Sequence, residues 1–366
     1  MTNAVLPGSS VSKGCQIEPV VQAHNRRNIA VIRPRFAECT VPVYNAFMCY
    51  SAKVQQHLRS LAKRFGADVD SALFEQLFER RLTDEDIKVA RALESNFDEP
   101  RDAVERRIHE HIEAHRKAIG GRWETDLFKQ KKRLADAQRS LRQKETKKAR
   151  DDERIATNKI AATVERLANL RRRDVGEEDE RIFPRYFVPI VVREGGRLLV
   201  RPMRYQCRLA SKPVTSDERY PGTYNARRDN LQGFWSDVYG TQHGVMVVNS
   251  FYENVPLHLF EQRALPPGEK EKSLVLHFNP QPPQEMLVAC LWSHWTHPTD
   301  PDLYSFAAVT DDPPPEVAAT GHNRCIIAIK PENVAEWLAP ERLGASRLDE
   351  ILTDRPRPFY EHQIAA

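Results

Sequence analysis

A methionine and cysteine pair near the start of the chain offers the most distinctive chemistry in the sequence. Cys49 directly follows Met48, so removal of everything up to the methionine would leave a cysteine at the N-terminus. An N-terminal cysteine carries its thiol and its α-amine on adjacent carbons, and together they can convert an aldehyde into a five-membered thiazolidine. Neither group can form that ring alone. The pair therefore predicts capture of an aldehyde, provided that Cys49 becomes the first residue.

Three polar residues later in the chain have side chains suited to assist such a reaction. Asn225 follows a Pro-Gly turn signal and offers an amide that can orient an amine. Glu253 follows an apolar run, and apolar surroundings favour the neutral carboxyl group that donates or accepts a proton near neutral pH. His322 can exchange a proton at physiological pH. Each also has an ordinary interpretation, as a turn asparagine, a surface glutamate and one of 12 histidines.

Arginine and aromatic residues lie close to these positions and suggest contacts with a nucleic acid. Arg227 and Arg324 each present the planar guanidinium group that binds phosphate well. Trp235, Tyr224 and Phe251 could stack on bases, although aromatic residues at strand ends more often pack in a core. The sequence leaves stacking and packing both open.

Composition excludes several classes of protein. The 366 residues include 40% hydrophobic residues, enough for a packed core, and the net charge of +4 permits a polyanion partner without requiring one. No apolar run approaches the roughly 20 residues of a membrane span, and residues 1–47 lack a secretory signal, so we expect a cytoplasmic protein with no membrane partner, nucleoid-associated when on DNA. The six cysteines lack metal or disulfide spacing, so we expect no metal and no cofactor.

Three stretches with different patterns must position these residues. Residues 1–47 have little periodicity and read as a disordered extension, either a propeptide or a misassigned translation start. Residues 52–180 have helical periodicity and many basic residues, with leucines at seven-residue spacing, a break over 142–154 and a renewed stripe, which predicts a long helix or a helical hairpin. We favour a solvated arm over a nucleic-acid-binding arm, because charge runs usually face water.

The remainder has the short apolar runs of β-strands, separated by Pro, Gly and Asn. The expected strands are 186–192, 197–200, 244–248, 272–278, 286–292, 305–310 and 325–329. Helical patterning returns at 332–353, before a tail at 354–366. The predicted class is α+β.

Taken in order, these motifs resemble the SOS-response-associated peptidase (SRAP) family of abasic-site processing proteins. The resemblance rests on Met-Cys49, Tyr-Asn-Ala-Arg227, Ser-Phe-Tyr-Glu253, Ala-Cys-Leu-Trp292 and Gly-His-Asn-Arg324, and it covers residues 48–50 and about 183–338. It implies a mainly β, barrel-like catalytic domain formed by 48–51 and 181–353, with 52–180 as a helical insertion. It also implies that the partner is single-stranded DNA containing abasic sites. A replication or repair partner that docks on the insertion is a further expectation.

The resemblance also implies roles for individual residues. Cys49 would attack the aldehyde and Asn225 would orient its amine. Glu253 would transfer protons during peptide release and crosslinking, and His322 would assist opening of the sugar. Arg227 and Arg324 would hold phosphates. Arg185 lies in a segment that resembles the family's Arg-Tyr-Asn-x-Ala-Pro, here Arg-Tyr-Phe-Val-Pro.

Some positions differ from the family pattern and keep two other functions open. The family has Gly-Arg after the cysteine where this chain has Tyr50-Ser51, a glutamate where it has Asp229, and commonly a tryptophan where it has Asn254. One alternative is a cysteine peptidase that acts on other proteins. The other is a binding protein whose active site has decayed. An uncleaved segment before Cys49 would favour these alternatives, because it would hold the α-amine as an amide.

Overall fold

Five strands form a closed barrel in the computed structural model, which describes residues 51–365. They are β5 (Tyr186–Glu194), β6 (Arg197–Tyr205), β8 (His243–Pro256), β10 (Met286–Trp295) and β11 (Leu303–Asp311). Neighbouring strands pair in the order β5, β6, β11, β10, β8, and β8 returns to β5 through the pairs Val191–Val245 and Val192–Gly244. All pairs are antiparallel except that of β6 with β11. The α+β class and the barrel-like core are confirmed.

Alternating side chains give the barrel strands two buried faces. On β5, Val188, Ile190 and Val192 belong to one apolar cluster, whose members come mostly from strands. Phe187 and Val191 point the other way and join a second cluster that includes residues of several helices. The period of two along each strand therefore fills the barrel and also provides a surface on which the helices pack.

Further strands extend the sheet beyond the five of the barrel. β9 (Ser273–Gln281), predicted as 272–278, pairs with β8. β13 (Phe359–Ile364), in the stretch predicted as a tail, pairs with β9. Three short strands in the stretch predicted as helical also join the sheet: β1 (Ser51–Val54), β2 (Asp68–Val69) and β3 (Lys88–Val89). β4 (Arg181–Ile182) pairs with β1, and β7 (Asn225–Arg227) and β12 (Cys325–Ile326) pair with β11. Strands of two to four residues are too short to show a period in the sequence.

Helices on the outer face of the barrel bury apolar side chains against it. They are α1 (Leu58–Phe65), α2 (Ser71–Arg80), α3 (Arg91–Glu94), α9 (Val334–Trp337) and α10 (Ala345–Thr353). Phe74 of α2 and Trp337 of α9 are fully buried in the cluster that covers the barrel. Three further four-residue helices lie between strands: α6 (Ser216–Arg219), α7 (Leu257–Phe260) and α8 (Pro315–Ala318).

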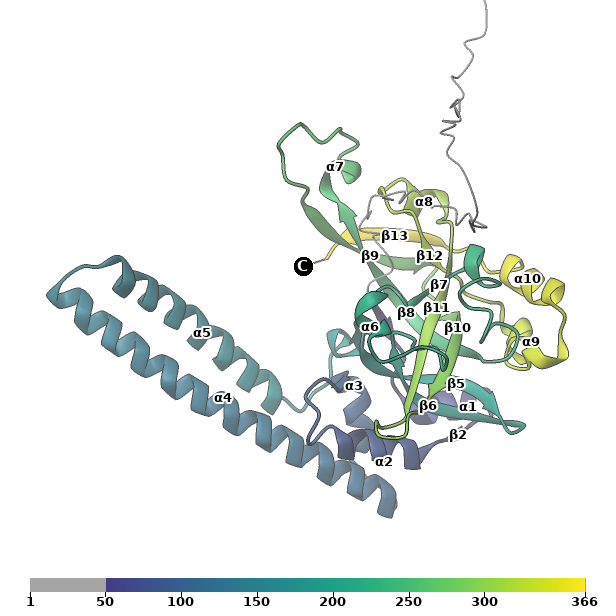
Figure 1. The fold of residues 1–366 in the computed structure, drawn as a ribbon, viewed down its shortest axis with the longest axis horizontal. Helices are drawn as coiled ribbons and strands as arrows, with labels where there is room; N and C mark the ends of the chain where they lie inside the picture. Colours follow the sequence, from purple (N-terminus) through teal and green to yellow (C-terminus); the bar gives the residue numbers. More distant parts are fainter. Residues whose placement is uncertain (1–50, 366) are drawn as a thin grey trace, which may run out of the picture. The chain divides into compact units, whose positions relative to one another are not determined.

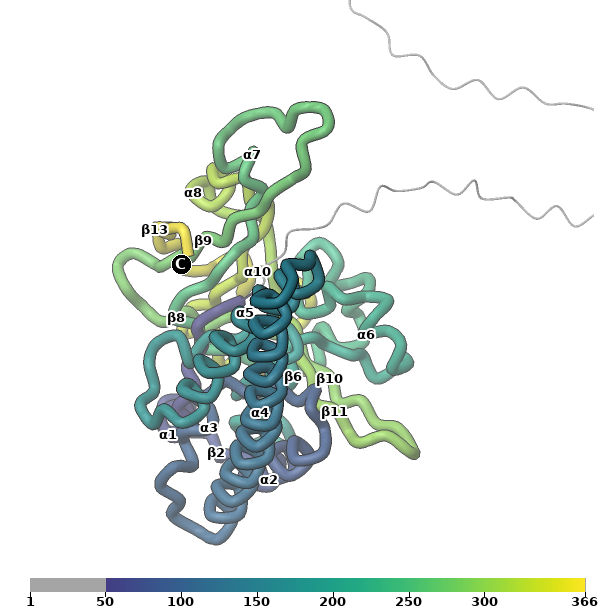
Figure 2. Tube along the Cα trace, turned by 90° about the vertical axis from the view of Figure 1, so that its left-hand side faces the viewer, coloured from purple at the N-terminus to yellow at the C-terminus, as the bar shows by residue number. Residues whose placement is uncertain are grey.

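The charged stretch forms a helical hairpin of α4 (Ala103–Gln143) and α5 (Lys147–Arg171), which lie side by side (Figures 1 and 2). Side-chain caps fix both starts: Asp102 accepts the Glu105 N–H at 2.8 Å, and Thr146 accepts the Ala149 N–H at 3.2 Å. The turn falls within the stretch where the apolar stripe lapses, because residues that turn between helices have no partner helix to pack against. The prediction of a long helical region is confirmed.

Cys49, the expected nucleophile, and the whole of 1–47 lie outside the described residues. Within 51–365, no helix is both long enough and apolar enough to cross a membrane.

Candidate functional site

A buried acid and base pair forms the chemical centre of the described molecule. The Nε2 atom of His322 lies 3.1 Å from the Oε2 atom of Glu253, and both side chains are completely buried. Glu253 stands on β8, and His322 stands in the segment between α8 and β12. The fold thus brings together two residues that are 69 positions apart in the sequence.

The contacts of the His322 ring indicate where its protons lie. Nδ1 is 2.8 Å from the carbonyl oxygen of Arg324, a contact that needs a proton on Nδ1, and 3.3 Å from the Arg324 amide, which would donate to an unprotonated Nδ1. The shorter contact favours the tautomer with the proton on Nδ1. Nε2 faces the Glu253 carboxyl group. A single further proton, on the ring or on the carboxyl group, would make the pair neutral overall and limit the cost of burying it. The pair can therefore hold one proton ready for transfer.

Gly321 allows the backbone turn that presents His322. Its φ of +91° lies in the region that residues with side chains rarely adopt. A Cβ atom at this position would lie 2.6 Å from the Cβ atom of Leu259, on α7. Both the conformation and the close approach of the two segments require glycine here.

β11 aligns the other predicted site residues. Ala308 pairs with Asn225, and Thr310 pairs with Arg227 on one side and with Ile326 on the other. Ile326 is four residues after His322, so the β7 and β12 segments flank the same end of β11. Asn225 is buried and Arg227 is exposed. The β7 segment with Asn225 and the β12 segment that follows His322 therefore lie on opposite edges of the same end of β11.

The two predicted phosphate-binding arginines have different surroundings. Arg227 donates to Asp229, with 2.9 Å between Nε and Oδ1, and this hydrogen bond raises the pKa of Arg227. Asp229 is exposed, so a phosphate could replace it without moving buried groups. Arg324 is only 7% exposed, and within 51–365 no carboxylate lies within ion-pair distance of its guanidinium group. A buried arginine without an acidic partner favours an anionic ligand.

Arg185 is an exposed arginine on a strained backbone. Its φ is +75°, and its amide donates to the Tyr205 carbonyl at 2.6 Å. Gln206, whose φ is +141°, accepts from the Arg185 side chain at 3.3 Å. Two non-glycine residues with positive φ that contact each other through their side chains are uncommon, and such backbone strain concentrates at functional sites.

The structure does not offer Trp235 as a surface for base stacking. Its side chain is 3% exposed and lies in the apolar cluster on the outer face of the barrel, edge-on to Phe234. A base could stack on this ring only if the surrounding segment moved away. Phe251 is also buried, stacked on Phe278 with ring centroids 5.1 Å apart.

A polar cluster on the opposite face of β8 escaped the sequence analysis. Ser250 and Tyr252 alternate with Phe251 and Glu253, so they point away from the buried pair. Ser250 is 2.7 Å from Nε2 of His277, and the Tyr252 and His277 rings stack with centroids 4.2 Å apart. The two-residue alternation along Asn249–Asn254 was the signal that could have predicted it. Its buried side chains cover the face of β8 opposite to Glu253.

Within 51–365, no group of three or more His, Cys, Asp or Glu side chains could hold a metal ion. The pair of Glu253 and His322 can exchange protons without one.

Comparison with known proteins supplies the family. The profile of the SOS response associated peptidase (SRAP) family matches residues 141–365. The chain belongs to this family. SRAP membership connects the protein with the response to DNA damage and with DNA binding in general. The matched residues include Asn225, Glu253 and His322.

Three solved structures resemble this SRAP protein at low sequence identity. A protein from Bacteroides thetaiotaomicron is 14% identical, with 51% of this chain and 77% of that chain covered and a TM-score of 0.38. A protein from Bordetella bronchiseptica is 14% identical, with 53% and 90% covered and a TM-score of 0.39. A phage-related protein from Bordetella bronchiseptica is 18% identical, with 50% and 80% covered and a TM-score of 0.38. A comparison with curated proteins gives no match.

Proposed function

We propose that this SRAP protein captures abasic sites in single-stranded DNA as a covalent thiazolidine through Cys49, after the residues before Cys49 are removed. The observation that carries the proposal is the fully buried pair of Glu253 and His322, 3.1 Å apart. A buried proton-sharing pair suits a reaction that first needs an acid and then a base. The same pair would serve the release of the preceding peptide.

The start of the described chain supports this role for Cys49. Ser51 pairs with Tyr252, the neighbour of Glu253, across β1 and β8. Cys49 is two residues before Ser51, so covalent geometry keeps its Cα atom within about 7 Å of the Ser51 Cα atom. Glu253 directly follows Tyr252 on β8. The proposal therefore requires Cys49, which is the one cysteine in the sequence that follows a methionine, to reach the Glu253 and His322 pair.

The proposed reaction balances without a cofactor. An abasic site has a C1′ aldehyde in equilibrium with its closed sugar, and the Cys49 amine adds to that carbon and loses one water to form an imine. The thiolate then attacks the imine carbon and the imine nitrogen takes up a proton. Water needs an acid in order to leave, and the thiol needs a base in order to react. Glu253 and His322 would supply both by moving one proton.

The remaining predicted residues would hold the substrate. Asn225 would orient the Cys49 amine, while Arg227, Arg324 and Arg185 would contact phosphates on either side of the lesion. Single-stranded DNA fits best, because a lesion in a duplex must be flipped out at a cost of a few kcal/mol. Phosphate contacts would make binding weaken steeply with salt.

The test is covalent capture of an abasic oligonucleotide by protein that starts at Met48, with its N-terminal cysteine verified by intact mass. We expect a heat-stable shifted band on a denaturing gel for the wild type and none for Cys49→Ala. Absence of the band from protein with a free N-terminal cysteine would overturn the proposal and favour a binding protein with a decayed site.

A second arm of the experiment separates a propeptide from a misassigned start. Full-length protein with Glu253→Gln should retain residues 1–48 if they are removed by this site, since glutamine cannot exchange the required proton. Intact mass measures the retention. Wild-type protein that also keeps the segment would show that this site does not release it, which is expected if translation naturally starts at Met48 and also if the protein is a thiol-only peptidase or a binding protein.

A further inference from the structure

The end of the helical hairpin holds a concentration of positive charge that the barrel lacks. Residues 129–154 contain eleven lysines and arginines and five acidic residues, a net charge of +6. The whole chain has a net charge of +4, so the other residues together are slightly acidic. The end of the hairpin therefore carries a larger net positive charge than the whole chain.

Ion pairs use up the acidic residues at this end. Four of the five carboxylates pair with arginines, in Arg133–Asp152, Arg139–Asp136, Arg150–Glu145 and Arg154–Asp151. The fifth, Glu153, accepts a hydrogen bond from Gln138 at 3.3 Å. Seven exposed cations have no ion pair within the described chain: Lys129, Lys131, Lys132, Arg142, Lys144, Lys147 and Lys148. Repulsion among them is relieved by an anionic partner.

An exposed aromatic ring lies among these cations. Phe128 is 80% exposed, directly before Lys129 and one helical turn before Lys132. The three side chains line a shallow hollow of about 530 Å³. Lys129 and Lys132 also line a second hollow of about 480 Å³, together with Lys148 of α5. The two hollows thus meet at the lysines and run from the aromatic ring to the end of the hairpin.

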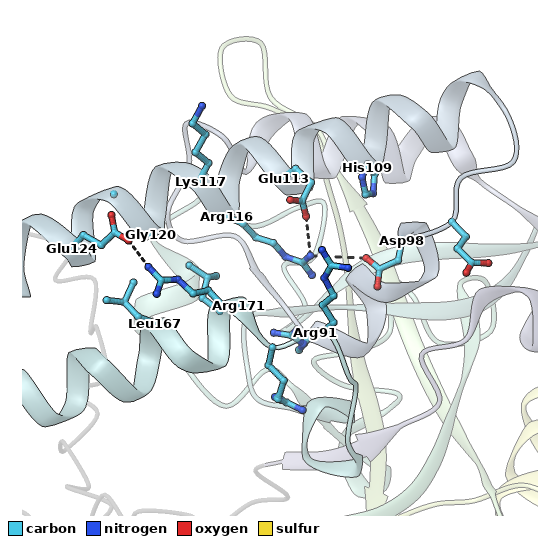
Figure 3. A pocket seen from close by; sticks show the side chains of 15 residues that line it. Arg91, Asp98, His109, Glu113, Arg116, Lys117, Gly120, Glu124, Leu167 and Arg171 are labelled. Carbon is cyan, nitrogen blue, oxygen red and sulfur yellow. Dashed lines mark hydrogen bonds and ion pairs between the residues drawn. The ribbon is translucent and has the colours of Figure 1, made fainter.

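The base of the hairpin combines paired and unpaired charges. A hollow of about 1010 Å³ lies between α4 and the end of α5 (Figure 3). Two of its acids pair with arginines, Glu113 with Arg116 at 3.0 Å and Glu124 with Arg171. Arg91, Lys117 and Arg173 line the hollow without an ion pair in the described chain. Cations without an ion pair are therefore present at the base too, but the far end holds the larger group of seven.

We propose that the hairpin surface formed by Phe128, the seven cations and the two hollows is a second DNA-binding surface, which binds single-stranded DNA outside the catalytic site. This inference goes beyond the proposed function and does not depend on abasic-site chemistry. Cationic side chains contact the backbone, and the exposed ring stacks on a base. That combination is typical of sequence-independent binding of single strands.

The aromatic ring decides between single and double strands. Lysines and arginines alone bind either form through phosphate. A ring exposed to 80% on the surface of a helix has a face available for an unpaired base, whereas the bases of a duplex are already stacked. From Phe128 to Gln143 the helix rises about 22 Å, at 1.5 Å per residue, which gives room for several phosphates.

The test measures binding of undamaged oligothymidylate by fluorescence anisotropy at several salt concentrations, with Cys49→Ala in the full chain. Lys129, Lys132, Lys147 and Lys148 are replaced together by alanine. Each phosphate contact on a single strand contributes about 0.7 to the salt slope, so we expect the slope to become shallower by at most about 3 and affinity at low salt to fall at least tenfold.

The matched control removes four exposed cations elsewhere that also lack ion pairs: Lys63, Arg219, Lys270 and Lys272, each replaced by alanine. A separate Phe128→Leu variant keeps the apolar character and removes the aromatic face, and Phe128→Trp keeps both. We expect the control and Phe128→Trp to bind like the parent, and Phe128→Leu to bind several-fold more weakly.

Three outcomes would overturn the inference. The first is equal loss of affinity in the hairpin variant and the control. The second is tighter binding of duplex than of single strand, with no effect of Phe128→Leu. The third is a parent protein that self-associates in sedimentation and becomes monomeric on Phe128→Leu with DNA binding unchanged, which would make this surface an interface between copies. Because the DNA is undamaged and Cys49 is absent, none of these outcomes depends on crosslinking.

Discussion

Glu253 and His322 are far apart in the sequence but lie together in the fold. In the proposed chemistry, burial matters because a carboxyl group and an imidazole in water would each exchange protons with solvent independently. The distance of 3.1 Å and the contact of Nδ1 with the Arg324 carbonyl fix the ring in one orientation. Position is therefore as important as residue type for the proposed chemistry.

Gly321→Ala should disable the site by displacing His322. The added Cβ atom would lie 2.6 Å from that of Leu259, so the segment must shift. We expect crosslinking to fall at least tenfold in the denaturing-gel assay. Gly268→Ala is the matched control, because Gly268 has a similar φ of +86° but no atom within 4 Å of the added Cβ. The control should lose about 1 to 2 kcal/mol of stability and keep its activity. Equal activities of the two variants would contradict a positioning role for Gly321.

His243 should make stability depend on pH. Burial lowers its pKa to about 3, whereas the unfolded residue has a pKa near 6.5. Its contribution is full above pH 6.5 and is lost as pH falls toward 3, because the unfolded chain takes up a proton that the folded chain cannot. Replacing His243 by Gln removes this titration, so the difference in unfolding free energy between the two proteins should narrow by about 2 kcal/mol from pH 7 to pH 5. Urea unfolding at both pH values measures it, and a constant difference would refute the assignment.

Among the elements, the hairpin depends on a buried ionic contact at its base. Glu94 at the end of α3 is 7% exposed and binds Arg81, just after α2, and Arg116 of α4, the latter at 2.8 Å. Ile108 and Ile112 of α4 are buried in the cluster that covers the barrel. One carboxylate thus connects three helices while apolar packing secures the first turns of α4.

Glu94→Gln should destabilise the protein strongly. Removing one partner of a buried ion pair costs about 3 to 5 kcal/mol, because the remaining charges are left without compensation. Glu113→Gln removes the exposed partner of the same arginine and should cost less than about 1 kcal/mol. Chemical denaturation of both variants gives the comparison. Similar losses of unfolding free energy in the two variants would show that Glu94 does not hold the three helices together.

At the scale of the whole molecule, we expect the barrel and the far end of the hairpin to carry independent functions, crosslinking and binding of undamaged DNA. A Cβ atom at Gly120 would be 3.3 Å from Leu170, so the two helices are adjacent there and a short Gly-Ser linker can replace residues 122–168. We expect this deletion protein to fold and to crosslink an abasic oligonucleotide. Its binding of undamaged single-stranded DNA should be weaker and less dependent on salt. Failure to fold, seen by circular dichroism, would show that the hairpin belongs to the cooperative unit of the barrel.

The sequence predicted those features that repeat over many residues. Apolar runs indicated six of the long strands, although the predicted 197–200 and 244–248 cover only the first parts of β6 and β8. The seven-residue leucine spacing indicated a long helix or a helical hairpin, with a break near the observed turn. These signals come from one element's own periodicity, so no partner is needed to detect them. The short strands β1, β2 and β3 carried no such signal and were assigned to the helical stretch.

The order of the motifs along the sequence also predicted the family, because such a resemblance needs only the residue types and their order. Only the tertiary structure decided which candidates meet. It placed Glu253 beside His322, paired Asn225 of β7 with Ala308 of β11 and buried Trp235 in a core. It also showed that ion pairs consume the acids at the hairpin end and leave seven cations free. Burial, proton sharing and ion pairing depend on distances between groups that the chain brings together only by folding, and a linear sequence does not contain those distances.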